Sequence, residues 1–384
     1  MKIALYLYLF GVFLTPFYFF NSGGIQLSDF FFITSLLSLL KNKNNFHFLK
    51  AVNMPGFYYL KVFVFWTLIV NLVYFVIWGD TFTLMSAFYY IYNFSLMVLS
   101  VTLCLYDRKT FLVRLYFITF LSITTIFVIS YLNLDYLFSN KYFYRRSVTF
   151  NNPNQLGYWS LVVLSIITVI HKIIIKNGIN IKYINIILFS SVLMSFYLSM
   201  ISLSKAASIS IVILIILFSF NKLKIILPMI LLFFTVFYFV GMKEGNFIDK
   251  YFKRLDSIGE SNDDGLEGRN YDRIWKYPDY LFFGAGEGAI EQRFEKDNEI
   301  HSTLGTILFS YGFFGITLFF LFLFSIYKKM KYEFIVIVLP IIAYGLTHMG
   351  IRFKLFWIVL ALFSLYRDNH LRRSRDSKTS SNSV

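Results

Sequence analysis

The sequence predicts an all-α polytopic membrane protein with about twelve transmembrane helices and one large external loop that carries short helices. Composition is the first observation behind this prediction: 57% of the 384 residues are hydrophobic and 21% are aromatic, whereas only 15% are charged. The second is the distribution of charge, because charged residues are concentrated in one late segment and in short connections between apolar runs. No soluble core could bury this much apolar surface, so we expect the chain to lie in a membrane.

Apolar runs of roughly 17 to 25 residues, long enough to cross a bilayer as helices, recur along the chain. We expect spans at residues 3–20, 26–40, 57–78, 82–105, 111–134, 156–175, 183–203, 206–220, 223–241, 303–327, 333–349 and 352–366. The runs 26–40 and 206–220 are short for a crossing and could be re-entrant. The N-terminal run lacks a small-residue cleavage site, so we interpret it as the first transmembrane helix and not as a signal peptide.

Lysine and arginine residues between the runs predict the orientation. On one side of the membrane they gather in the connections at residues 41–50, 108–109, 172–182, 222–224 and 328–331. On the other side, the short connections 21–25, 79–81 and 203–205 hold only Lys205. Because cytoplasmic loops carry an excess of Lys and Arg, both termini are predicted to be cytoplasmic. The net charge of +15 is then a topology signal, and we expect no nucleic-acid partner.

The same signals divide the chain into four parts. We expect a transmembrane bundle of about nine spans at 1–241 with an outer loop at 136–155, a large extracytoplasmic loop at 242–302, the last transmembrane helices at 303–366 and a basic cytoplasmic tail at 367–384. The large loop holds most of the Asp and Glu residues. Cys104 is the only cysteine, so no intrachain disulfide can form and this loop must keep its shape by packing on the bundle.

The outer loop 136–155 carries cations on the side where they are disfavoured. Arg145 and Arg146 could contact lipid phosphates, or they could bind an anionic substrate, because the arginine fork matches phosphate geometry. Asn152-Pro153 is most simply a helix start, with the asparagine as the cap and the proline at the first helical position. That structural role leaves a functional role open for Asn154.

Two further outer segments carry polar residues. Lys205 lies in a tight turn between two predicted spans, where a lysine either reaches the lipid headgroups or faces a bound anion. The large loop contributes Arg269, Arg273, Gly284 and Gly286. Glycine amides can approach a phosphate closely, but a Gly-x-Gly-x-Gly run with no strand before it is by default a turn-rich loop.

His301-Ser302 ends the large loop, just before the apolar run that begins near Leu304. The positive end of a helix dipole favours the neutral imidazole, which is the form that a general base requires. The alternative is a packed or interfacial histidine. The sequence contains no His-x-x-x-His pair, Gly-x-Ser-x-Gly elbow, Walker loop or Asp-rich metal-diphosphate pair, so we expect neither a metal nor a cofactor.

The order of these motifs resembles the O-antigen polymerase and O-antigen ligase superfamily over roughly the second two thirds of the chain. The resemblance rests on His301-Ser302 followed by Gly312 and Gly315, on Arg146 with Asn152-Pro153-Asn154, on the Ser202–Lys205 turn, and on Gly268-Arg269 with the glycines at 284–288. Lys205 departs from the family, which more often has arginine there. A lysine keeps the positive charge but loses bidentate geometry.

This resemblance implies a metal-independent, inverting membrane glycosyltransferase. Such an enzyme would polymerise polyprenyl-diphosphate-linked oligosaccharide repeat units into O-antigen or capsular polysaccharide at the outer face of the bacterial inner membrane. We expect Arg146, Arg269 and Arg273 to stabilise the diphosphate leaving group, with Lys205 and Asn154 assisting. His301 would accept the proton of the incoming sugar hydroxyl. Substrate binding would also involve Arg145, Gly284, Gly286 and Ser302.

Two alternatives remain open. The ligase of the same superfamily would transfer finished glycan to the lipid A core, and a non-catalytic lipid-linked oligosaccharide flippase or transporter would only move it. A transporter predicts charges along the membrane midplane, whereas charges such as Arg114 fall near the ends of the predicted spans. We favour the polymerase because polymerases of this superfamily tend to be short and strongly aromatic. Expected partners are membrane lipid, a chain-length regulator and the flippase of the same pathway.

Overall fold

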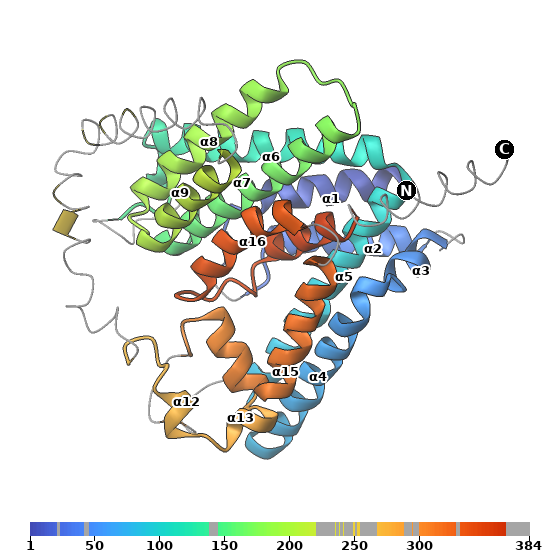
Figure 1. Cartoon of the computed structure of the whole chain (residues 1–384), viewed down its shortest axis with the longest axis vertical. Coiled ribbons are helices and arrows are strands. Elements are labelled where there is room, and N and C mark those ends of the chain that lie inside the picture. The colour runs from blue at the N-terminus through green and yellow to red at the C-terminus, as the bar shows by residue number, and fades with distance from the viewer. Residues whose placement is uncertain are drawn as a thin grey trace.

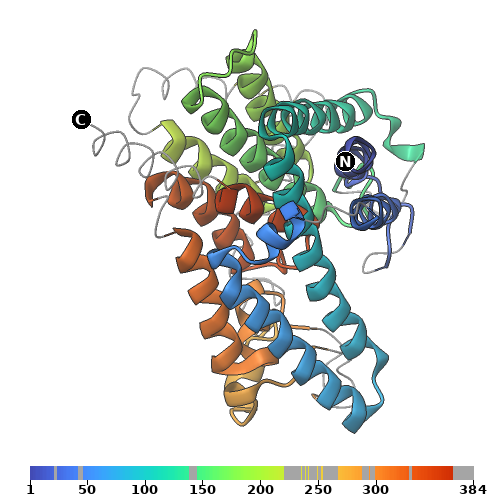
Figure 2. The same ribbon diagram turned by 90° about the vertical axis from the view of Figure 1, so that its right-hand side faces the viewer.

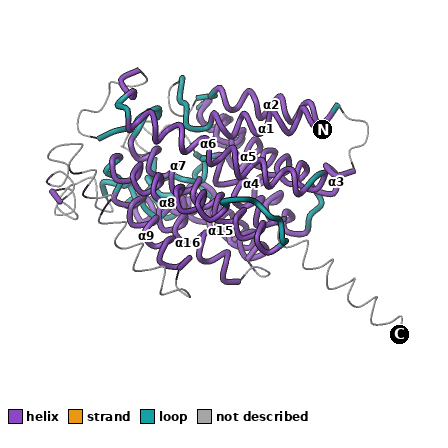
Figure 3. Tube along the Cα trace, turned by 90° about the horizontal axis from the view of Figure 1, so that it is seen from above, coloured by secondary structure: helices purple, strands orange, loops and turns teal. Residues whose placement is uncertain are grey.

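The computed structural model describes residues 1–20, 24–41, 46–137, 145–219, 267–287, 299–327 and 331–365, together with a few isolated positions between 235 and 294. Within these residues every regular element is a helix, and Figure 3 shows helices joined by loops without a strand. The all-helical part of the predicted fold is therefore confirmed for the described chain.

Six of the described helices are long and apolar enough to cross a membrane. They are α4 (Tyr58–Trp78, preceded by the short helix η1, Pro55–Phe57), α5 (Thr81–Tyr106), α6 (Arg108–Tyr131), α7 (Pro153–Lys176), α8 (Ile184–Ile201) and α15 (Thr303–Tyr327). Each corresponds to a predicted span. Local capping fixes where two of them start, because the side chains of Asp80 and Asp107 accept hydrogen bonds from the first-turn amides of α5 and α6.

The other apolar helices of the described chain are shorter. They are α1 (Lys2–Leu14), α2 (Leu27–Leu40), α9 (Lys205–Ser219), α16 (Lys331–Gly345) and the C-terminal helix Lys354–Leu365, with α3 (Phe46–Val52) and η2 (Leu134–Leu137) as connecting elements. α1 ends at Leu14, short of the predicted limit at residue 20, because Pro16 lacks an amide hydrogen and restricts the residue before it. The predicted count of about twelve crossings is not confirmed. Most of the predicted span 223–241, most of 242–266 and the tail 367–384 lie outside the described residues.

α7 is the central helix of the larger group of helices. Nearly all of its apolar stretch is buried, and it packs against α6, α8, α9 and α16. α1 and α2 pair with each other at one edge of this group (Figures 1 and 3). α4, α5 and α15 extend from it toward the lower end of Figure 1, and α15 runs alongside α4 in both side views (Figures 1 and 2).

α15 is broken at Gly312, where φ is 69° and the conformation is not helical. The carbonyl oxygens before the break accept hydrogen bonds from outside the helix: Phe309 and Ser310 from the amides of Ala285 and Gly286, and Tyr311 from the indole of Trp66. A Cβ atom at Gly312 would lie 2.2 Å from the Phe282 carbonyl oxygen, so only glycine permits this approach. The loop segment that follows the one-turn helices α12 (Arg273–Lys276) and α13 (Tyr280–Phe283) is therefore inserted against the break.

Candidate functional site

Arg145 joins the start of α7 to the turn that precedes α9. Its Nε donates to the Ser202 carbonyl oxygen at 3.0 Å, and its Nη2 donates to the side-chain oxygen of Asn154 at 2.5 Å. Asn154 is placed there because Asn152 caps α7, accepting a 2.8 Å hydrogen bond from the Asn154 amide, and Pro153 takes the first helical position. The predicted helix start is thus confirmed.

Arg269 and His301 are joined through their backbones. The amide of His301 donates to the carbonyl oxygen of Arg269 at 3.1 Å. The Arg269 guanidinium donates to the carbonyl oxygen of Thr347, in the loop that follows α16. The His301 side chain is exposed, and it stands just before the first residue of α15, Thr303. The backbones of an arginine and a histidine are therefore joined directly before the start of α15.

Tyr344, near the end of α16, connects Arg145 with Arg269. Its hydroxyl donates to the Asn154 carbonyl oxygen at 3.0 Å, and its carbonyl oxygen accepts from the hydroxyl of Thr347, the residue whose carbonyl oxygen binds Arg269. The ring of Tyr344 stacks on His348, with ring centres 4.7 Å apart. We call Arg145, Asn154, Arg269, His301, Tyr344 and His348 the arginine–histidine cluster. Lys205 begins α9 at the end of the Ser202 turn, next to this cluster in the chain.

Arg146 and Ser302, which the sequence assigns to substrate binding, make contacts that hold the fold. Arg146 binds both carboxylate oxygens of Asp135: its Nε donates to Oδ2 at 2.9 Å, and its Nη2 lies 2.8 Å from Oδ1. Arg146 also donates to the Ser130 carbonyl oxygen. These contacts bind Arg146 to the end of α6. They explain why an arginine lies on the predicted outer side, and no bound substrate is needed for that explanation. Ser302 is buried, and its hydroxyl oxygen caps α15 by accepting from the Gly305 amide at 3.1 Å.

The glycine amides of the large loop are engaged in backbone hydrogen bonds. Gly286 donates to the Ser310 carbonyl oxygen at 2.9 Å, and Gly284 donates to the Tyr280 carbonyl oxygen at 2.8 Å. The Tyr74 hydroxyl in turn donates to the Gly284 carbonyl oxygen at 3.0 Å. The Gly286 amide is therefore paired at the break in α15, and the Gly284 amide is paired at the end of α13.

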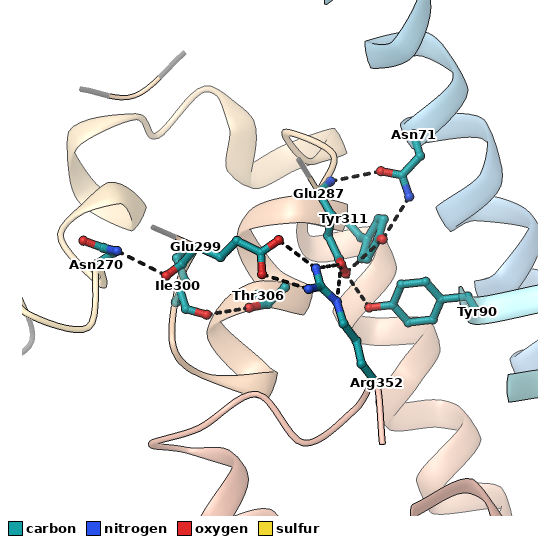
Figure 4. Close-up of polar contacts among 9 residues, drawn as sticks. All are labelled: Asn71, Tyr90, Asn270, Glu287, Glu299, Ile300, Thr306, Tyr311 and Arg352. Carbon is teal, nitrogen blue, oxygen red and sulfur yellow. Dashed lines mark hydrogen bonds and ion pairs between the residues drawn. The ribbon is translucent and has the colours of Figure 1, made fainter. Parts of the chain in front are cut away.

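A second cluster surrounds Arg352, in the loop between α16 and the C-terminal helix (Figure 4). Arg352 donates to the carboxylates of Glu287 and Glu299. Glu287 also accepts from the hydroxyls of Tyr90 at 2.6 Å and Tyr311 at 3.0 Å. We call these five residues, together with Asn71, the Arg352 cluster.

Arg273 lies beside the Arg352 cluster. Its side chain is buried, with the guanidinium over the Phe294 ring, 5.5 Å from the ring centre. It lines a small internal cavity together with Glu287 and Glu299. The predicted pair of Arg269 and Arg273 is thus divided between the two clusters, since Arg269 reaches Thr347 in the arginine–histidine cluster.

The sequence analysis overlooked Arg352 and the neighbouring Lys354. Lys354 Nζ lies 2.7 Å from the Asp29 carboxylate, which also accepts from the Tyr92 hydroxyl at 2.6 Å. The signal that could have found both residues is two cations at the start of an apolar run, because ionisable residues in or beside membrane spans are expensive and need partners. The acidic partners lie far away in the chain, so no local pattern predicts the pairs.

The arginine–histidine cluster combines guanidinium groups, which bind anions, with an exposed imidazole, which can accept a proton. Among the described residues, no three His, Cys, Asp or Glu side chains lie close enough to hold a metal ion. Over its described residues the protein is all-helical, with six helices long and apolar enough to cross a membrane. No family model matches the chain, and no curated protein matches it.

Proposed function

We propose that this protein is a membrane glycosyltransferase that polymerises polyprenyl-diphosphate-linked oligosaccharide repeat units. The observation that carries the proposal is a chain of contacts that links Arg145 with Arg269. Arg145 and the Tyr344 hydroxyl both donate to Asn154, Arg269 donates to Thr347, and the Thr347 hydroxyl donates to the Tyr344 carbonyl oxygen, while the His301 amide is bound to the Arg269 backbone. Two guanidinium groups suit a diphosphate, and the adjacent imidazole suits the deprotonation of a sugar hydroxyl.

The reaction needs one bond to form and one to break. The incoming hydroxyl gives its proton to His301 while its oxygen bonds to the anomeric carbon of the donor. The bond from that carbon to the diphosphate oxygen breaks, and its electron pair leaves with the diphosphate. Arg145 and Arg269, with Lys205 and Asn154 assisting, stabilise the charge that develops. Direct in-line attack inverts the anomeric centre.

Chain topology supports the same placement. The segments that meet in the arginine–histidine cluster are the starts of α7, α9 and α15 and the end of α16. The charge pattern assigns all of these ends to the outer side of the membrane. The proposal is therefore a multi-pass protein of the bacterial inner membrane with about twelve spans. Both termini are cytoplasmic, and the site lies at the outer face.

This proposal assigns the cations differently from the sequence analysis. Arg146 and Arg273 have structural roles in this proposal, because Arg146 is bound to Asp135 and Arg273 is buried in the loop. Arg145 instead binds the diphosphate and stabilises its developing charge. The ligase, which transfers glycan to the lipid A core, needs the same site chemistry. A flippase is the candidate of a different class. The ion pair of Asp29 with Lys354 does not favour it, because both residues stand in the first turns of their helices and not along a path through the midplane.

The experiment is the size distribution of surface glycan, resolved on a gel, from cells that lack this gene and carry either the wild type or His301→Ala. General-base catalysis contributes roughly a hundred- to ten-thousandfold, so His301→Ala should abolish the long ladder and leave single-repeat glycan on the lipid anchor. Total loss of glycan from the anchor, with accumulation on the carrier at the outer face, identifies the ligase. Accumulation at the cytoplasmic face identifies the flippase, and a normal ladder overturns the role of His301.

A further inference from the structure

We propose that Arg352 and Glu299 are positioning residues that hold Arg269 and His301 together as one unit, and that Glu287 anchors this unit to the membrane helices. The inference rests on the proposed function for what Arg269 and His301 do. The attachment itself depends only on the contacts of the Arg352 cluster. Three steps lead from the helices to the imidazole.

The first step is the anchor at Glu287, whose side chain is 1% exposed. Its carboxylate accepts from the hydroxyls of Tyr90 on α5 and Tyr311 on α15. Its amide donates to the side-chain oxygen of Asn71 on α4 at 2.9 Å, and the Asn71 side-chain NH₂ group donates to the Tyr311 hydroxyl at 3.0 Å. Three helices therefore fix the position of one buried carboxylate.

The second step is the fork of Arg352. On one side its Nε and Nη2 donate to Glu287, with the Nε contact at 3.1 Å. On the other side Nη1 and Nη2 donate to the two carboxylate oxygens of Glu299, at 2.9 and 2.8 Å. Two parallel hydrogen bonds to one carboxylate restrain its direction as well as its distance. Arg352 thus transfers the fixed position of Glu287 to Glu299 (Figure 4).

The third step runs through the backbone from Glu299 to the reacting groups. The carbonyl oxygen of Glu299 accepts from the side chain of Asn270 at 3.1 Å, and Asn270 follows Arg269 directly. The His301 amide donates to the Arg269 carbonyl oxygen, and the Ile300 carbonyl oxygen accepts from Thr306 in the first turn of α15 at 2.9 Å. The segments that carry the proposed diphosphate ligand and the proposed base are therefore bound to each other and to Glu299.

The two carboxylates differ in a way that makes the inference testable. The Glu287 side chain is 1% exposed and the Glu299 side chain is 25% exposed. Arg352→Gln would leave Glu287 charged in a buried site, so that variant could fail to fold. Glu299→Gln instead leaves Arg352 paired with Glu287. It removes the charge and one of the two acceptor oxygens at residue 299, and so weakens only the connection from Arg352 to the segment that carries His301.

The first test measures position without activity. In a Cys104→Ala background, a nitroxide spin label on His301→Cys reports the mobility of this site, because Cys104 is the only cysteine. We expect Glu299→Gln to increase the mobility of the label. Asp135→Asn is the matched control, since Asp135 is held by an arginine fork at a similar exposure of 23%, and it should leave the mobility unchanged. Unchanged mobility in Glu299→Gln overturns the proposal.

The second test measures polymer formation by the purified full-length protein in lipid with a polyprenyl-diphosphate-linked repeat unit. Misplacement of a base costs roughly ten- to a hundredfold in rate, so Glu299→Gln should lose that much. Glu299→Gln should cost less rate in the His301→Ala background than in the wild type, because only the positioning of Arg269 is then still lost. If the two losses multiply, Glu299 does not act through His301. If the wild type forms no polymer, the proposed function fails, and the spin label alone decides the positioning role.

Discussion

The arginine–histidine cluster and the Arg352 cluster use the same kind of side chain with different partners. Arg352 binds two carboxylates, and one of them is almost fully buried. Arg145 and Arg269 donate to neutral oxygens of Ser202, Asn154 and Thr347. The two carboxylates neutralise the Arg352 guanidinium and fix the chain around it, whereas the carbonyl and amide oxygens fix the directions of the Arg145 and Arg269 guanidinium groups. The first arrangement suits a structural joint, and the second orients two cations near His301 in the proposed site.

The largest effect is expected in the Arg352 cluster. Arg352→Gln leaves the Glu287 carboxylate buried without its cation, which should lower the free energy of unfolding by about 3–5 kcal/mol. Glu287→Gln/Arg352→Gln removes both charges and should recover most of that loss. Thermal unfolding in detergent, with the yield of folded protein, measures both variants. If the double variant is no more stable than Arg352→Gln, the pairing of these charges does not set the stability.

The next effect concerns activity in the arginine–histidine cluster. Arg145→Gln and Arg269→Gln should each lower the polymerisation rate by roughly ten- to a hundredfold, because a hydrogen bond to a charged group contributes about 1.5–3 kcal/mol. Arg145→Lys and Arg269→Lys keep the charge but lose the fork, so they should retain part of the rate. Rates per folded molecule in reconstituted vesicles give the comparison. A rate for Arg145→Gln equal to that of the wild type would remove Arg145 from the site.

A smaller effect tests how the loop fits against α15. Gly286 has a φ of +70°, and a Cβ there would lie 3.0 Å from Tyr74. Gly178 has a similar φ of +64°, but no atom lies within 4 Å of its Cβ position. Gly178→Ala should therefore cost only the backbone strain, about 1 kcal/mol, and Gly286→Ala about 2 kcal/mol. Equal losses in thermal unfolding would mean that the contact with Tyr74 is not tight.

The smallest effect separates the two adjacent arginines of the outer loop. Arg146→Gln should lower the free energy of unfolding by about 1 kcal/mol, because its ion pair with Asp135 is partly exposed. The polymerisation rate per folded molecule should stay at the wild-type value, in contrast to Arg145→Gln. A loss of rate as large as that of Arg145→Gln would mean that Arg146 binds the substrate, as the sequence predicts.

Features that depend on neighbouring residues, such as the start of a helix, could be predicted from the sequence. The capped start of α7 at Asn152-Pro153 depends on neighbouring residues, and the sequence predicted it correctly. The stop of α1 is also local, but Pro16 lay inside a run that hydropathy alone extended to residue 20. Arg352 could not be placed, because Glu287 lies 65 residues away in the chain and only the folded structure brings the two together.

The same limit applies to the site. Arg145, Arg269 and His301 are polar residues on the predicted outer side, and all three were predicted from the sequence to be site residues. The contacts that link Arg145 with Arg269 run through Tyr344, which lies inside an apolar run and carries no sequence signal. The glycines of the large loop resembled an anion-binding run, but the Gly286 amide binds the backbone at the break in α15 and the Gly284 amide binds the backbone of α13. A glycine pattern shows where the backbone bends tightly, and it does not show which partner comes close.

The most direct test of the central claim is a reconstitution. Purified protein in lipid vesicles would receive a polyprenyl-diphosphate-linked repeat unit and no other enzyme, and the products would be resolved by size. The account predicts a ladder of carrier-linked polymer with the wild type and a rate at least about a hundredfold lower with His301→Ala. Absence of any product longer than one repeat with the wild type, under conditions in which the protein is folded, would contradict it.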